Sequence, residues 1–327
     1  MTDQEIKNII DLAVDLKEKQ VRPDTMEDIE TIPTLTMGDL KRNLTDEYPI
    51  DVQENAHGTG ITLVSHDIVS TSGILYADFA VDVSNVPFED IKYLQLFDSL
   101  LGSVGIDSNS SKGNYTTIEE LSQYIGIHTG GLSTQLLVTS VNHEAEDDNV
   151  VLNDENFISK LIVMGKATED QTSHLFQLFN DILLNSNFED AQDKAIEILQ
   201  SSCSFLKDMA IPSSGDSFAS VRLRARYSVS GMLDETMYGI RSVDLLCNDV
   251  LPKVKDNWPH VLNKLASIKD IIFDQYLTRS GMVINLTGDK QVLSFVESDV
   301  KSFLDRLPGI ANSNTKLPNF YNTTHPW

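Results

Sequence analysis

Residues 72–105, SGILYADFAVDVSNVPFEDIKYLQLFDSLLGSVG, contain a strand pattern followed directly by a helix pattern. In the first half, apolar side chains occupy every second position: Leu75, Ala77, Phe79, Val81 and Val83. Tyr76, Asp78 and Asp82 fall between them, which predicts a strand with one buried face and one solvated face. After Pro87, apolar residues recur at helical spacing and predict a helix with a wide apolar face.

A second apolar run precedes this strand, in HGTGITLVSHDIV at residues 57–69. The turn-forming tetrapeptide STSG at residues 70–73 separates the two runs. Two apolar runs joined by a short turn are typical of a β-hairpin. We therefore expect the two strands to pair with each other.

Further strands and helices follow through the rest of the chain. Thr117 and Glu120 have the spacing of a capping box and predict the start of a short helix that ends near Tyr124. The later patterns predict strands at 132–141 and 157–167, helices near 175–182 and 189–209, several helices from 218 to 276, a strand at 281–288 and a helix from Asp289 to about Leu307. Strands that come in adjacent pairs favour an antiparallel or mixed sheet packed against helices, so the predicted fold class is α+β.

The first 50 residues predict a helical arm attached to this domain. The helix expected at residues 4–17 has one apolar face, formed by Ile6, Ile9, Ile10, Ala13 and Leu16. Such a face has to pack against another surface. We expect three regions: the arm at 1–50, an α+β domain at 51–311 and a linker-like tail at 312–327.

The composition excludes several classes of protein. The chain has 327 residues, with 49 acidic and 25 basic side chains and a net charge of −24. No cationic run is longer than Lys41-Arg42, which argues against nucleic-acid binding because phosphate contacts need clustered cations. The sequence also lacks a run of about 20 apolar residues and a signal-peptide pattern at MTDQEIKNII, so we expect no membrane span and no targeting segment.

The two cysteines, Cys203 and Cys247, occur in apolar helical contexts. This setting predicts reduced thiols in the core, not a disulfide, and neither cysteine has a neighbouring histidine or cationic cluster that would activate it.

No catalytic motif is present, and we predict no catalytic, cofactor-binding or metal-binding residues. No two of the seven histidines are three to five residues apart, so no helix can present a histidine pair to a metal. In HEAED at residues 143–147, Asp147 occupies the place of a second histidine, which favours a solvated acidic turn. Arg222 and Arg226 would share a helix face where an anion could bind, but ion pairs with neighbouring acids are favoured.

Five segments in the same order resemble one family. They are IPTLTMGDLKR (32–42), residues 72–105 as quoted above, NYTTIEELSQYIGIHTGGLS (114–133), FISKLIVMGKATE (157–169) and SFASVRLRARYSVSGMLDETMYGIRSVDLL (217–246). Together they resemble the pitrilysin/insulinase-type zinc metallopeptidases, in particular the presequence-protease and falcilysin branch. The resemblance extends from about residue 32 to 307 and corresponds to the end of the inter-lobe helical hairpin plus the first domain of the C-terminal lobe.

The resemblance implies a two-lobed enzyme whose zinc is held elsewhere, by an H-x-x-E-H helix and a distant glutamate. This chain contains no H-x-x-E-H, so those roles are assigned to no residue here. Nor does Arg226-Tyr227 have the spacing of the arginine and tyrosine that the last domain contributes. We expect a non-catalytic domain, inactive alone, that forms part of a closed chamber for peptide degradation.

The implied partners are unfolded peptides, the catalytic N-terminal lobe and the last domain, in the interior of a mitochondrion, plastid or vacuole. The alternative is a free-standing inactive homologue that acts as a peptide- or protein-interaction subunit. The tail at 312–327 and the N-terminal helix favour a piece of a longer chain over this alternative.

Overall fold

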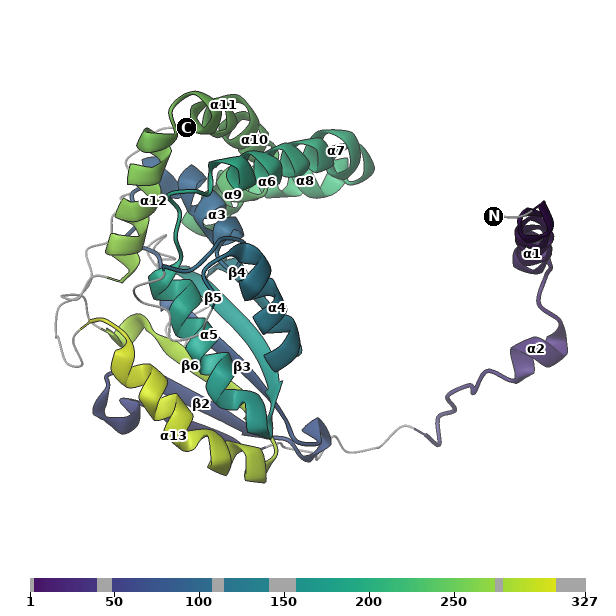
Figure 1. Ribbon diagram of the computed structural model, residues 1–327, viewed down its shortest axis with the longest axis horizontal. Coiled ribbons are helices and arrows are strands. Elements are labelled where there is room, and N and C mark those ends of the chain that lie inside the picture. The colour runs from purple at the N-terminus through teal and green to yellow at the C-terminus, as the bar shows by residue number, and fades with distance from the viewer. Residues whose placement is uncertain (1–2, 40–48, 108–114, 141–156, 274–278, 310–327) are drawn as a thin grey trace, which may run out of the picture. The chain divides into compact units, whose positions relative to one another are not determined.

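The computed structural model describes residues 3–39, 49–107, 115–140, 157–273 and 279–309 (Figure 1). Contacts divide the chain into two units, Met1–Glu47 and Tyr48–Trp327. The expected tail at 312–327 and the acidic turn at 143–147 lie outside the described residues. No helix in the described part of the chain has the length and apolarity needed to cross a bilayer.

The N-terminal unit consists of two helices, α1 (Asp3–Val21) and α2 (Met26–Glu30). Large apolar side chains of α1 are exposed to solvent, including Ile9, Leu12 and Leu16. After α2, the Asp39 carboxylate accepts hydrogen bonds from the backbone N–H and the hydroxyl of Thr36, 2.8 and 2.7 Å long, and closes a short turn. The helix has the apolar face that its periodicity predicts.

The second unit is built on a six-stranded mixed sheet with the order β1-β2-β6-β3-β5-β4. Its strands are β1 (Ile50–Gln53), β2 (Thr62–Asp67), β3 (Ile74–Asp82), β4 (Leu132–Ser140), β5 (Phe157–Thr168) and β6 (Val283–Gly288). β2 and β6 are parallel, and the other neighbours are antiparallel. The mixed sheet confirms the predicted α+β class.

The hairpin expected between β2 and β3 is wrong. β6 lies between them and pairs with both, so that Ile284 faces Leu63 on one side and Phe79 on the other. The turn at residues 70–73 connects two strands that are not neighbours. This arrangement depends on a strand about 200 residues further along, and no local pattern shows it.

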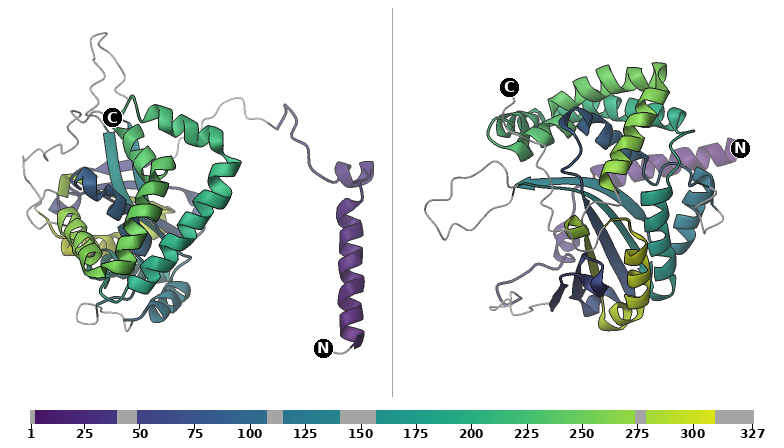
Figure 2. Two further views of the ribbon diagram at one scale, coloured as in Figure 1. Left: turned by 90° about the horizontal axis from the view of Figure 1, so that it is seen from above. Right: turned by 90° about the vertical axis from the view of Figure 1, so that its left-hand side faces the viewer.

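Helices cover one face of the sheet. α5 (Thr172–Asn185) and α13 (Lys290–Arg306) pack against it and against each other, and α4 (Ile118–His128) contacts α5 (Figures 1 and 2). Phe303 of α13 meets Phe79 of β3 edge to face, with ring centroids 5.2 Å apart, and lies 5.6 Å from Phe176 of α5. These rings join both helices to the central strand.

The remaining helices gather at one end of the sheet (Figure 1). They are α3 (Ile91–Leu100), α6 (Gln192–Ser204), α7 (Ile211–Ser213), α8 (Gly215–Arg224), α9 (Val229–Met237), α10 (Ile240–Val243), α11 (Leu251–Asp256) and α12 (Trp258–Ile272), with π-helical stretches at Phe205–Ala210 and Asp244–Val250. The Thr117–Glu120 capping box is confirmed at the start of α4, and Asp289 caps α13 through the N–H groups of Gln291 and Val292.

Cys203 and Cys247 form a disulfide, with their Cα atoms 5.8 Å apart, so the prediction of reduced thiols is wrong. Their apolar contexts indicate burial correctly, since the two residues are 7 and 9% exposed. The pairing arises because α6 packs against the π-helical stretch at Asp244–Val250. That packing joins segments 44 residues apart in sequence, which helical periodicity does not show.

Candidate functional site

The second face of the sheet is the main candidate for a functional surface. The described helices of this unit lie against the opposite face or beyond the end of the sheet (Figure 2). Apolar side chains are exposed on three of its strands: Tyr76 on β3 (41% exposed), Leu137 on β4 (39%) and Ile158 on β5 (37%). The strand register places them on one face, which we call the open face. The alternation in residues 74–83 predicts this solvated side of β3.

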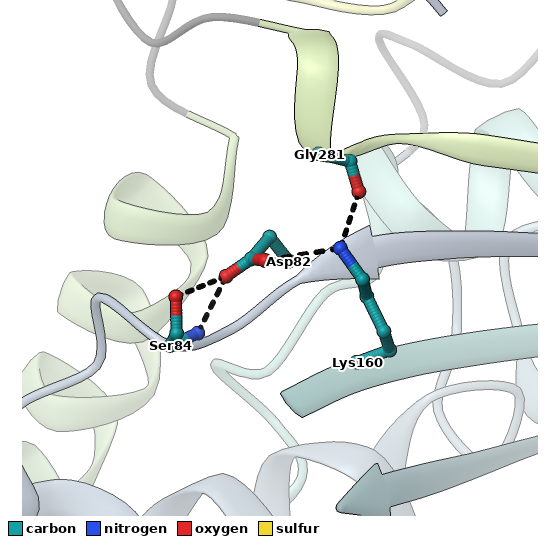
Figure 3. A network of polar contacts seen from close by, with 4 residues as sticks. All are labelled: Asp82, Ser84, Lys160 and Gly281. Carbon is teal, nitrogen blue, oxygen red and sulfur yellow. Dashed lines mark hydrogen bonds and ion pairs between the residues drawn. The ribbon is translucent and has the colours of Figure 1, made fainter. Parts of the chain in front are cut away.

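Charged side chains on the open face are paired (Figure 3). The Lys160 ammonium donates to Asp82 Oδ2 at 3.0 Å and to the Gly281 carbonyl at 2.7 Å. Asp82 Oδ1 in turn accepts from the backbone N–H of Ser84 at 2.8 Å and from its hydroxyl. The network therefore ties the end of β3 to β5 and to the residues before β6, and it leaves neither partner free as a nucleophile or base.

A neighbouring polar pair has the same character. The Asn285 amide of β6 donates to Asp78 Oδ2 of β3 at 3.2 Å. Since these polar groups already have partners, the exposed apolar side chains between them dominate what the open face offers a ligand. Such a surface suits contact with an extended chain of varied sequence, because apolar contact is not directional.

The structure brings two histidines together that sequence spacing does not connect. The imidazole rings of His128 in α4 and His174 in α5 stack with centroids 4.1 Å apart. His128 Nδ1 lies 2.7 Å from Gln171 Oε1, and His174 Nδ1 contacts the Tyr124 hydroxyl. Partial burial and the neighbouring His128 hold the pKa of His174 below its usual value. Their proximity follows from packing of α4 on α5.

The histidine pair has no further ligand for a metal. Within the described ranges, no group of three or more His, Cys, Asp or Glu side chains is placed to hold a metal ion. The sequence also lacks H-x-x-E-H. The donor set found here therefore does not fit a zinc centre, which needs about four ligands when closed and three plus water when catalytic.

The basic segment of α8 behaves partly as expected. Arg222 Nη1 lies 2.7 Å from Glu235 Oε1, which confirms the predicted ion pair for this residue. Arg224 pairs with Asp234 at 3.5 Å. Arg226, just past the helix, makes no ion pair with any residue that the structure describes.

Comparison with known proteins gives one family match. Residues 1–248 match the family described as associated with peptidase M16, subfamily C. Presequence protease 1 of Arabidopsis thaliana, chloroplastic/mitochondrial, is 28% identical over 323 residues, which cover 97% of this chain and 27% of the relative. The mitochondrial presequence protease of Saccharomyces cerevisiae is 28% identical over 315 residues, covering 94% and 28%.

The chain thus spans little more than a quarter of the length of these two relatives. Among solved structures, the peptidase M16 inactive domain from Pseudomonas fluorescens gives a TM-score of 0.48 at 13% sequence identity. That match covers 83% of this chain and 54% of the other.

Proposed function

Because the chain belongs to the family associated with peptidase M16, subfamily C, we propose that it is a non-catalytic part of a presequence-protease-like zinc metalloendopeptidase. In this proposal the domain forms one wall of the chamber in which unfolded peptides are degraded. Zinc and the residues that activate water belong to another part of the enzyme, where the metal would polarise the scissile carbonyl and generate the nucleophile.

The open face is the observation that supports this role. It presents Tyr76, Leu137 and Ile158 to solvent on a rigid sheet, and its charged groups are held in pairs. A peptide lying on it would gain apolar contacts with little demand on sequence. The resulting binding energy would hold the peptide while chemistry takes place elsewhere, so it would lower KM more than it raises kcat.

The proposed partners are unfolded peptides, the catalytic lobe and the last domain of the longer enzyme. The relatives named above are organellar, and we propose the interior of such an organelle as the location of the enzyme. The apolar, solvent-exposed face of α1 would contact the other lobe as part of the inter-lobe connection.

Kinetics of the full-length enzyme test the role of the open face. A Tyr76→Ala/Leu137→Ser variant removes apolar area from two neighbouring parts of this surface. We expect KM for a presequence-like peptide to rise about threefold to tenfold, with kcat within twofold of the parent value. Ile127→Ser is the control, because Ile127 is an equally apolar side chain on α4, 65% exposed and outside the open face.

An unchanged KM in the double variant, or the same change in the control, would contradict the proposal. The alternative subunit role predicts a different result. A free-standing module would bind the peptide without any catalytic lobe, and its assembly partner would show no loss of turnover when this chain is omitted.

A further inference from the structure

A cavity of about 780 Å³ lies where α8, α9 and α10 meet, away from the residues that define the open face. Three of the chain's eight arginines line it: Arg222, Arg226 and Arg241. This concentration of guanidinium groups is unusual in a protein with a net charge of −24. Positive charge gathered around one hollow, within an acidic molecule, indicates an anion-binding site.

A buried carboxylate neutralises only one of these arginines. Glu235 in α9 is 3% exposed, and its Oε1 atom accepts from Arg222 Nη1 at 2.7 Å and from the backbone N–H of Arg241 at 3.3 Å. Its Oε2 atom is buried and has no hydrogen-bond partner among the described residues. Arg222 is therefore committed to Glu235.

The other two guanidinium groups have no carboxylate partner within the described segments. Arg226 makes no ion pair there, and the Arg241 guanidinium lies 5.8 Å from the centre of the Phe88 ring. Asp244, which also lines the cavity, is exposed and accepts a hydrogen bond from the Asn248 amide at 3.0 Å. Two forked donors that line one cavity thus remain available for a ligand.

The surroundings restrict which anion fits. Guanidinium groups bind carboxylates and phosphates through paired hydrogen bonds. The buried Glu235 carboxylate would repel a doubly charged phosphate more strongly than a singly charged carboxylate. The wall also includes Ile240, which is 42% exposed and offers apolar contact beside the cations. The favoured ligand is a carboxylate attached to an apolar residue.

We propose that this cavity binds the C-terminal carboxylate of a peptide, with Arg226 and Arg241 as the donors. That the carboxylate belongs to a peptide rests on the proposed function, whereas the anion site rests on the arginines alone. Capture of the C-terminus would fix one end of an unfolded chain whatever its internal sequence, which is a known mode of peptide recognition.

Titration of the full 327-residue chain with two forms of one peptide tests the site. The probe is an unstructured ten-residue peptide that ends in leucine and lacks acidic side chains, prepared as the free acid and as the C-terminal amide. We expect the free acid to bind at least tenfold more tightly than the amide. Arg226→Gln should weaken binding of the free acid at least tenfold and abolish the difference between the two forms.

Arg224→Gln is the matched control, because Arg224 lies on the same segment but does not line the cavity. It should change the affinity less than twofold, and thermal melts should show that both variants remain folded. Equal binding of acid and amide, no effect of Arg226→Gln, or inorganic phosphate competing as well as the free acid would each overturn the assignment. Those results would leave the KM test of the open face unaffected, so failure of this site and failure of the proposed function are distinguishable.

Discussion

Asp98, in the last turn of α3, has a buried Oδ1 atom without a hydrogen-bond partner among the described residues. Burial raises the pKa of this carboxyl to about 6. The folded protein therefore keeps the proton up to about pH 6, whereas an unfolded aspartate loses it near pH 4. The free energy of unfolding should accordingly fall as the pH rises from about 4 to about 6, and stay lower above that range.

Asp98→Asn should remove this pH-dependent loss. At pH 7.5 we expect the free energy of unfolding in urea to exceed that of the parent chain by roughly 1–3 kcal/mol, and at pH 4 to be nearly equal. Asp256→Asn, at an exposed position, serves as the control. An equal gain for Asp98→Asn at both pH values would mean that the carboxylate is not destabilised by its burial.

Gly239 is a residue where only hydrogen fits. A Cβ atom there would lie 1.9 Å from Glu235 Oε2 and 2.8 Å from Glu235 Cα. Gly239→Ala should therefore displace the carboxylate that pairs with Arg222 and lower the free energy of unfolding by roughly 1–3 kcal/mol. Gly126→Ala is the comparison, since a Cβ there meets open space within α4 and should stabilise by up to about 1 kcal/mol. Melting temperatures that move in the same direction for both would contradict this reading of Gly239.

At the level of elements, local patterns predict local structure well. The alternation in residues 74–83 gives β3 and its solvated side, and the caps at Thr117 and Asp289 give the starts of α4 and α13. Patterns fail where distant segments decide the outcome, as in the false hairpin between β2 and β3. The same limit applies to the candidate sites. The pairing of His128 with His174 and the meeting of Arg226 with Arg241 follow from helix packing, which sequence spacing does not encode.

The disulfide joins two helical elements and should contribute to stability. It closes a loop between residues 44 apart, so its reduction should lower the free energy of unfolding by about 2–4 kcal/mol. Urea titrations with and without dithiothreitol measure the difference. A Cys203→Ala/Cys247→Ala variant should show no response to the reductant. If thiol titration finds the bond reduced while the unfolding midpoint of the parent chain stays the same, the disulfide does not stabilise the fold.

For the whole molecule, we expect the two units to differ in local stability. The apolar side chains of α1 are exposed, while those of β3 that face the core are fully buried. Backbone amides of residues 5–17 should therefore exchange with deuterium at least about 100-fold faster than those of residues 74–82. Equal protection in a monomer would show that the arm belongs to the core of the domain and is not a connector between lobes.

The position of β6 has a consequence for how the protein is made. Thr62 of β2 pairs with Val283 of β6, so the sheet remains open in its middle until the ribosome has released the last part of the domain. During that interval the edges of β2 and β3 that later pair with β6 are exposed apolar strands of the kind that chaperones protect from aggregation. A gene fragment cut at residue 248, where the family match ends, would encode this unfinished sheet permanently.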